Sequence, residues 1–344
     1  MRMTMELPAQ LYDLGGVKPG TKQDWLLTFA TEEEARGEIP LHVVKGLEPG
    51  PTLLILAAVH GNEYEGVQTV MELIHALQPG DIRGTALLVP FANKLAYEGV
   101  SRETPLDGRN LAREFPGDPN GAYTQRLAWH LDHTLIAHAD FLLDYHSGGA
   151  NFSIPLLIGY YHHDEDEAGR RSRAAAEAFG IETIWAHPEV GPGRTVSSAT
   201  DRGIPWIYTE AFGGLRIRAE EQERYRLGAF RLMDHLGMLL QPERWIVGDC
   251  PRVRNRLLGD GNFDLSFCSN TAGFFIPAVQ LLDDVQTGDR IGTIYGAFGE
   301  ELQSIHTTAA GVVVGLAARP KINAGDSICA ITRRFEAAKP QTGR

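Results

Sequence analysis

Along the first two-thirds of the chain, short continuous apolar runs alternate with longer stretches that have helical spacing. A continuous apolar run indicates a strand that is buried on both faces, as strands of parallel sheets are. The predicted strands lie at residues 51–59, 85–90, 141–145, 154–158 and 205–209. The predicted helices lie at residues 67–77, 122–137, 166–179 and 219–239. This alternation predicts an α/β domain with a largely parallel sheet flanked by helices.

The two ends of the chain have a different character. Residues 1–35 are polar and irregular, and we expect an N-terminal arm or edge strands there. Beyond about residue 245, short β-rich segments such as residues 273–277 and 311–317 are separated by Gly and Asp turns, which indicates a small all-β domain. Because 344 residues exceed what one core usually organises, we predict an α/β domain at residues 1–245 and a β-rich domain at residues 246–344.

Charge and composition narrow the possible partners. A formal net charge of −12 argues against nucleic acid and anionic membranes, because both require a basic face. It does not exclude a small anionic substrate, since a few arginines in one cleft outweigh a diffuse negative surface at short range. The apolar runs are too short to span a bilayer, and the N-terminus lacks the apolar segment of a secretory signal. Cys250, Cys268 and Cys329 stand singly, so we expect a soluble cytoplasmic protein without a disulfide framework.

Three potential metal ligands follow the predicted strands. His60 comes directly after the run at residues 51–59, Glu63 lies three residues further on, and His146 follows the strand at residues 141–145. In an open α/β sheet, ligands bind outside the carboxyl ends of the strands, and neighbouring strands lie ~4.8 Å apart. Two imidazoles and one carboxylate leave a tetrahedral position open for water, which is typical of catalytic zinc. The same ligand set also binds other divalent metals.

Neither fragment of this constellation is specific by itself, because an HxxE spacing is common and a histidine at a strand end is more often structural than a ligand. Other histidines are also possible metal ligands. His130, His133 and His138 share one predicted helix without a suitable carboxylate on the same face, and we interpret them as packing or surface residues. The segment HHDEDE at residues 162–167 is interpreted as a solvated loop.

Four segments occur in an order and spacing that resemble a known protein family. They are HGNE at residues 60–63, GRNLAREFPG at residues 108–117, DYHSG at residues 144–148 and TEAFG at residues 209–213. Together they resemble the succinylglutamate desuccinylase/aspartoacylase family, whose members are related in fold to the zinc carboxypeptidases. The resemblance covers roughly residues 35–335. It implies a zinc-carboxypeptidase-like catalytic domain, followed by a β-rich domain that shapes or covers the active site.

The resemblance implies one Zn²⁺ per chain, with His60, Glu63 and His146 as the metal ligands. Glu210 matches the catalytic glutamate, which takes a proton from the attacking water and delivers it to the departing nitrogen. Without the motif, Glu210 would be interpreted as a carboxylate at a helix start, where the helix dipole favours negative charge. Asp144 faces the same side of its strand as His146, and we expect a buried residue bonded to backbone rather than a partner of that imidazole.

Substrate recognition is implied for the segment GRNLAREFPG. Arg113 matches the arginine that grips a substrate carboxylate with its planar fork, whereas without the motif it would be a surface ion pair with Glu114. The family usually has an asparagine before this arginine, and this chain has Ala112 there. Asn110 is the candidate replacement donor. The departure puts recognition of the substrate's acidic end in doubt, but not the metal chemistry.

A second arginine is implied for the chemistry itself. Arg102 lies where the family has an arginine that polarises the scissile carbonyl, and it could equally pair with Glu103 or Asp107. An oxyanion next to zinc and a cation is stabilised, and the loss of one such donor typically costs about 10²-fold in rate.

These roles predict a zinc-dependent hydrolase that cleaves the amide bond of a small N-acyl amino acid or acyl-diamine. Deacetylation of an N-acetylated diamino acid is the first expectation, with N-acetylaspartate and N-succinylglutamate as alternatives. A metallocarboxypeptidase acting on peptides is a second possibility, which a C-terminal domain over the site would disfavour. A non-catalytic small-molecule binding protein is a third, and only Ala112 speaks for it. The acyl group, the amine and a possible homo-oligomeric state stay open at this point.

Overall fold

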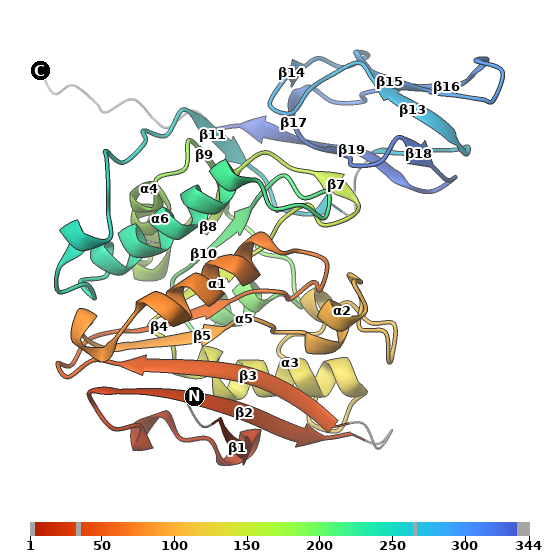
Figure 1. The fold of residues 1–344 in the computed structure, drawn as a ribbon. Coiled ribbons are helices and arrows are strands. Elements are labelled where there is room, and N and C mark those ends of the chain that lie inside the picture. Colours follow the sequence, from red (N-terminus) through yellow and green to blue (C-terminus); the bar gives the residue numbers. More distant parts are fainter. Residues whose placement is uncertain (1–3, 32–35, 264–266, 336–344) are drawn as a thin grey trace, which may run out of the picture.

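A computed structural model describes residues 4–31, 36–263 and 267–335 of the chain. One long mixed sheet runs through the molecule, with helices on both faces of its central part (Figure 1). In spatial order its strands are β1 (Met5–Pro8), β2 (Thr21–Ala30), β3 (Arg36–Lys45), β5 (Thr85–Val89), β4 (Thr52–Leu56), β6 (Phe141–Tyr145), β10 (Trp206–Glu210), β8 (Leu157–Tyr161), β9 (Thr183–His187), β11 (Asn255–Leu258), β19 (Ser327–Arg334), β17 (Gly311–Ala317) and β14 (Asp284–Val285). The neighbours β5, β4, β6 and β10 are parallel, and β8 runs antiparallel to β10. The predicted α/β class is confirmed.

The helices form a layer on each face of this sheet. One layer consists of α1 (Glu65–Ala76), α4 (Glu167–Phe179) and α6 (Ala219–His235), and the other contains α3 (Tyr123–Thr134) and α5 (Thr195–Asp201). Along β4, Leu53 and Ile55 pack with the first layer, whereas Leu54 and Leu56 pack with the second. Because successive side chains of a strand point to opposite faces, both faces of β4 are buried. This burial explains the continuous apolar run in its sequence.

The remaining helical elements are short. They are α2 (Lys94–Glu98) and the 3₁₀ helices η1 (Ala9–Leu11), η2 (Leu14–Gly16), η3 (Pro79–Asp81), η4 (Leu111–Arg113), η5 (Ile136–His138) and η6 (Pro242–Arg244). Two of them, α2 and η4, lie in the long segment between β5 and α3. That segment carries several of the residues that the sequence assigns to the active site.

Some boundaries differ from the sequence-based expectation. The strand predicted at residues 51–59 ends at Leu56, because Ala58 has a left-handed φ of 52° that turns the chain out of the sheet. The strand predicted at residues 154–158 lies three residues further on, as β8. The hydrophobic pattern does not predict β9 or α5, and both turn out to border the active-site pocket.

The two ends of the chain extend the sheet in opposite directions, and Figure 1 shows them as red and blue strands far apart. Within residues 1–35, β1 and β2 form an edge of the sheet, as one of the two expectations for this region stated. After η6, the named elements among the described residues are all strands. β11 is parallel to β9 and antiparallel to β19, so the C-terminal strands continue the main sheet without a break.

The C-terminal part also contains a second sheet, and two short strands pair with its strands, one of them from the middle of the chain. The second sheet has the order β16 (Glu301–His306), β15 (Arg290–Tyr295), β13 (Gly273–Pro277) and β18 (Lys321–Ile322). The attached strands are β7 (Phe152–Ser153), which pairs with β17, and β12 (Phe267–Cys268), which pairs with β19. A local hydrophobic core that includes Phe275, Ile294 and Ile328 lies among these strands. Across the described residues, no helix is long and apolar enough to cross a membrane.

Candidate metal centre and active-site pocket

The segment HGNE at residues 60–63 forms a tight turn between β4 and α1. Gly61 packs so closely against α2 that a Cβ there would lie 1.9 Å from the carbonyl carbon of Ala96. Any larger residue would therefore have to displace the backbone of α2. The turn brings two predicted ligands to the same side, with His60 Nδ1 2.9 Å from Glu63 Oε1.

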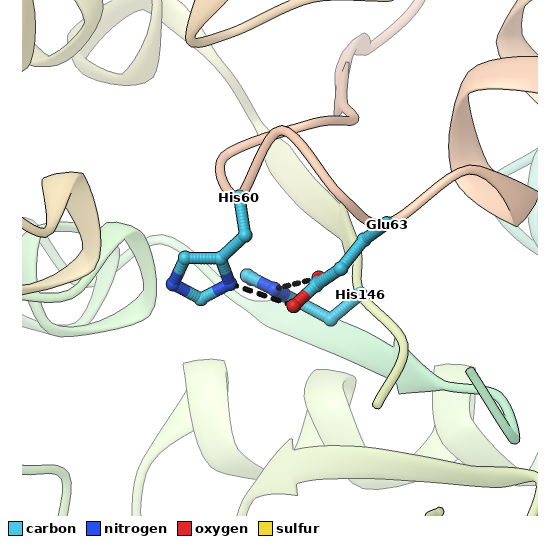
Figure 2. Close-up of side chains that lie close together, drawn as sticks. All are labelled: His60, Glu63 and His146. Carbon is cyan, nitrogen blue, oxygen red and sulfur yellow. Dashed lines mark hydrogen bonds and ion pairs between the residues drawn. The ribbon is translucent and has the colours of Figure 1, made fainter. Parts of the chain in front are cut away.

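His146 reaches the same point from the neighbouring strand. It follows directly after β6, which pairs in parallel with β4. Its Nδ1 lies 3.0 Å from Glu63 Oε2, and the dashed lines in Figure 2 join the Glu63 carboxylate to one nitrogen of each imidazole ring. One ligand atom from each of His60, Glu63 and His146 lies within 4.8 Å of the other two. In the part of the chain that the structure describes, this is the one cluster of such side chains with metal-ligand spacing.

The outer nitrogen of each imidazole faces an oxygen. His60 Nε2 lies 3.1 Å from Asn110 Oδ1, and His146 Nε2 lies 3.1 Å from Asp144 Oδ2. An acceptor at Nε2 favours a proton on that nitrogen and leaves the Nδ1 lone pair for a metal. Burial, followed by the charge of Arg102, lowers the pKa of His60 to about 4, which keeps this imidazole neutral as a ligand must be. The donor set therefore fits a divalent metal such as zinc.

The environment of Asp144 corrects the sequence-based expectation. This residue was expected to bond to backbone, but its Oδ2 faces His146 and accepts a hydrogen bond from Thr195 Oγ1 of α5. Its side chain is completely buried, so the carboxylate depends on these partners for its stabilisation. α5, which the sequence pattern does not predict, thus holds the carboxylate that orients a candidate metal ligand.

Glu210 is the last residue of β10 and lies beside this cluster. In the parallel pair of β10 and β6, Tyr208 is opposite Asp144, so the next residues on the same face are Glu210 and His146. The side chain of Glu210 is 8% exposed, and its Oε2 has no hydrogen-bond partner among the described residues. Burial and the neighbouring Glu63 raise the pKa of Glu210 to about 8. A buried carboxyl group with a free oxygen has the environment of a proton-transfer residue.

The three remaining predicted site residues come from the segment between β5 and α3. Arg102 Nη1 lies 3.3 Å from His60 Nδ1 and 3.4 Å from Glu63 Oε1, so its guanidinium borders the metal cluster. Arg113 ends η4 and lines the same pocket. Asn110 caps η4, where its Oδ1 accepts the Ala112 N–H at 2.9 Å and faces His60. The side-chain oxygen of Asn110 is thus committed to positioning, which leaves its amide nitrogen for other contacts.

A pocket of about 680 Å³, partly open to solvent, lies in front of this cluster. Its lining includes His60, Arg102, Arg113, His146 and Glu210, so the structure brings most predicted site residues together. Several lining residues were not predicted as site residues: His187, Glu189, Arg194, Tyr208, Asp260 and Phe263. His187 is the last residue of the buried strand β9. Its position is similar to that of His146, which directly follows the buried strand β6. This position at a strand end was the sequence signal by which His187 could have been found.

The other histidine cluster has a packing environment. The ring of His130 lies 4.8 Å from the ring of Phe29 and contacts Trp129 edge-on. Burial lowers the pKa of His130 to about 4, so it packs as a neutral side chain. His133 stacks on Trp129 and lies beside Asp132.

The fold and the site together define a mixed α/β protein with a candidate metal centre at the carboxyl ends of its central strands. Residues 49–236 match the family model of the succinylglutamate desuccinylase/aspartoacylase catalytic domain. The chain belongs to the succinylglutamate desuccinylase/aspartoacylase family.

Individual relatives match over nearly the whole chain. An N-alpha-acetyl-L-2,4-diaminobutyric acid deacetylase of Halomonas elongata is 30% identical over 330 residues, which cover 94% of each chain. A succinylglutamate desuccinylase/aspartoacylase structure from Rhodobacter sphaeroides has a TM-score of 0.81 at 25% identity and covers 94% of this chain and 98% of that one. The product-bound ectoine utilization protein EutE (DoeB) of Ruegeria pomeroyi has a TM-score of 0.80 at 25% identity, with coverage of 92% and 98%. The resemblance inferred from the four sequence segments is thereby confirmed.

Proposed function

We propose that the protein is a zinc-dependent hydrolase that removes the acetyl group from an N-acetylated diamino acid. The observation that carries this proposal is the convergence of His60, Glu63 and His146 on one point, with the buried carboxyl group of Glu210 lining the same pocket. The similarity to a deacetylase of N-acetyl-2,4-diaminobutyrate supports the choice of substrate class.

Each pocket residue has a distinct task in this reaction. Zinc, when bound by the two histidines and Glu63, would supply a Lewis acid that lowers the pKa of a water molecule. Glu210 accepts the proton of the attacking water and delivers it to the departing nitrogen, which leaves as an amine. Arg102 stabilises the negative charge that develops on the acetyl oxygen. Arg113 offers two parallel N–H groups to the substrate carboxylate.

The C-terminal part supports a small substrate over a peptide. Asp260, Gly261 and Phe263 follow β11 and line the same pocket as the metal cluster. A wall at this place limits the length of a bound chain. We therefore propose that residues 246–344 shape the active site, and that a metallocarboxypeptidase activity on long peptides is disfavoured.

Metal removal combined with a substrate panel tests this function. The protein is treated with a chelator, dialysed, and reloaded with Zn²⁺, and the release of acetate or amine is measured for N-acetyl-2,4-diaminobutyrate, N-acetylaspartate, N-succinylglutamate and an unstructured peptide. We expect turnover of the diamino acid derivative by the zinc-loaded protein and none by the stripped protein. Preferred cleavage of the peptide, or no turnover by protein shown to contain stoichiometric zinc, would refute the proposal.

A further inference from the structure

Tyr208 and His187 form a hydrogen-bonded pair on the pocket wall, outside the metal cluster. They lie on β10 and β9, which are separated by β8. Gly159 of β8 is directly opposite Tyr208, and a Cβ at Gly159 would lie 1.9 Å from the tyrosine ring. The missing side chain lets the ring lie across β8, so that the Tyr208 hydroxyl reaches His187 Nε2 at 2.9 Å.

The direction of this hydrogen bond follows from the other ring nitrogen. His187 Nδ1 lies 2.7 Å from the carbonyl oxygen of Gly259, which can only accept, so Nδ1 carries the proton. The ring is 1% exposed, and burial lowers the pKa of His187 to about 4, so the imidazole is neutral. Its Nε2 must then accept the proton of the Tyr208 hydroxyl. The tyrosine oxygen is left with lone pairs alone, and a ligand can only donate to it.

Two carboxylates line the same pocket as this pair. Asp260 lines it, and the adjacent Gly261 lies so close to the pair that a Cβ there would be 3.3 Å from the Tyr208 oxygen. Burial and the charges of Glu210 and Asp260 raise the pKa of Tyr208, which keeps the phenol protonated. Glu189 adds a further carboxylate to the lining. A hydroxyl that only accepts, next to negative charge, suits a cationic donor.

The same pocket also carries positive charge. Arg113 and Arg194 line it. The positive charge of Arg194 lowers the pKa of Tyr208, whereas the negative charge of Asp260 raises it. A wall with both signs matches a zwitterionic ligand better than a dianion such as N-acetylaspartate, because the carboxylates of Asp260 and Glu189 would repel the second carboxylate of a dianion. Glu210, whose buried Oε2 has no partner among the described residues, lines the same pocket as these charged groups.

We infer that the Tyr208 hydroxyl oxygen and the Asp260 carboxylate bind the free ammonium group of an N-acetylated diamino acid. The inference rests on the proposed function, and it assigns the preference for a diamino acid to these two residues. His187 acts as a positioning residue, because it fixes the tyrosine as an acceptor without touching the ligand. Arg113 and Arg194 face the α-carboxylate of the same molecule.

Two substrates that differ in one group test the assignment. N-acetyl-2,4-diaminobutyrate carries an ammonium group where N-acetylhomoserine carries a neutral hydroxyl. The ratio of their kcat/KM values is measured for wild type, Tyr208→Phe and Asp260→Asn. Asp289→Asn is the matched control, because this exposed aspartate also accepts a backbone N–H within a turn of the C-terminal part, as Asp260 does. We expect each pocket variant to lower the ratio by about 10- to 100-fold, as for the loss of a charge-assisted hydrogen bond, and the control to leave it unchanged.

The outcomes separate this inference from the proposed function. If both substrates lose activity equally in the pocket variants, the two residues serve folding or chemistry in general, and the inference is wrong. A ratio that stays constant in both variants also overturns it. If wild type turns over neither substrate, the proposed function fails, and calorimetric titration of the zinc-loaded protein with 2,4-diaminobutyrate and with homoserine then decides. Preferential binding of the diamine that is lost in Asp260→Asn supports the subsite, and equal binding of the two amino acids refutes it.

Discussion

The pocket has a metal side, which carries the candidate metal ligands His60 and His146, and a substrate side, which includes Tyr208, Asp260 and Glu189. The two sides are built in different ways. His146 and Asp144 belong to β6 or follow it directly, and they are held by further buried groups such as Thr195. Asp260 lies at an exposed position after β11, and Glu189 lies on the exposed connection between β9 and α5. A change on the metal side therefore leaves buried polar groups without partners, whereas a change at the exposed Asp260 or Glu189 costs little stability, typically within about 0.5 kcal/mol. On the proposed function, the chemistry would depend on the core of the fold, and the substrate preference could change at these exposed positions at little cost in stability.

The largest effect should come from the metal side. Glu210→Gln keeps the size of the side chain but removes its ability to accept a proton from water. We expect kcat to fall by up to about 10⁴-fold, with the zinc content unchanged. Glu48→Gln is the control, because this carboxylate lies on the surface and pairs with Arg83. Steady-state kinetics and metal analysis check the result. A variant that keeps wild-type kcat would remove Glu210 from the proton transfer and weaken the contrast between the two sides.

The next largest effect is expected for Arg102, the cation that borders the metal cluster. Arg102→Ala removes the guanidinium that borders His60 and Glu63, and we expect kcat/KM to fall by about 10²-fold, as for one lost oxyanion donor. Arg109→Ala is the matched control in the same segment, where Arg109 pairs with Glu114 near the surface. A loss confined to KM would mean that Arg102 binds the substrate and does not stabilise the transition state.

The sequence predicts the metal side far better than the substrate side, and the reason is geometric. His60 and His146 both follow buried strands, so the strand pattern places each at a strand end, and the family resemblance then joins them in one metal site, where β4 and β6 are neighbours. The contact between His60 and Asn110 spans fifty residues of chain and depends on how the segment after β5 folds back. Such a contact leaves no periodic signal.

The pocket wall was harder to predict for a second reason. Tyr208, His187 and Asp260 meet because the sheet order runs β10, β8, β9, β11, and this order is not the order of the chain. β9 has the sequence TIWAH, which is buried throughout but too short and mixed to stand out from its surroundings. Asp260 follows a strand of the C-terminal part, whose connection to the main sheet the composition does not indicate.

A moderate effect is expected for Asp144, the carboxylate that faces the candidate metal ligand His146. Asp144→Asn removes the negative charge that faces His146 Nε2 while keeping the side-chain shape. We expect the affinity for zinc to fall by about 10- to 100-fold, measured by competition with a chelating dye. Asp140→Asn is the control, since this residue precedes the same strand and caps the Thr52 N–H at an exposed position. If Asp144→Asn lowers the melting temperature of the metal-free protein but leaves zinc affinity unchanged, Asp144 supports the fold and not the metal.

The smallest effect should come from Ala112, where the chain departs from the usual sequence of its family. The residue is 7% exposed, lines the pocket, and donates its N–H to Asn110. Ala112→Asn adds one neutral hydrogen-bond donor beside Arg113, and such a bond changes KM by no more than about tenfold. We expect KM for N-acetylaspartate to fall while kcat and zinc content stay constant, with Ala112→Ser as the control that adds a shorter polar group. An improvement for N-acetylaspartate would show that a single position on the substrate side shifts the preference towards a dianion. A large fall in kcat would instead mean that η4 positions His60 through Asn110, and the substrate side would then be coupled to the metal side more tightly than the exposed connections suggest.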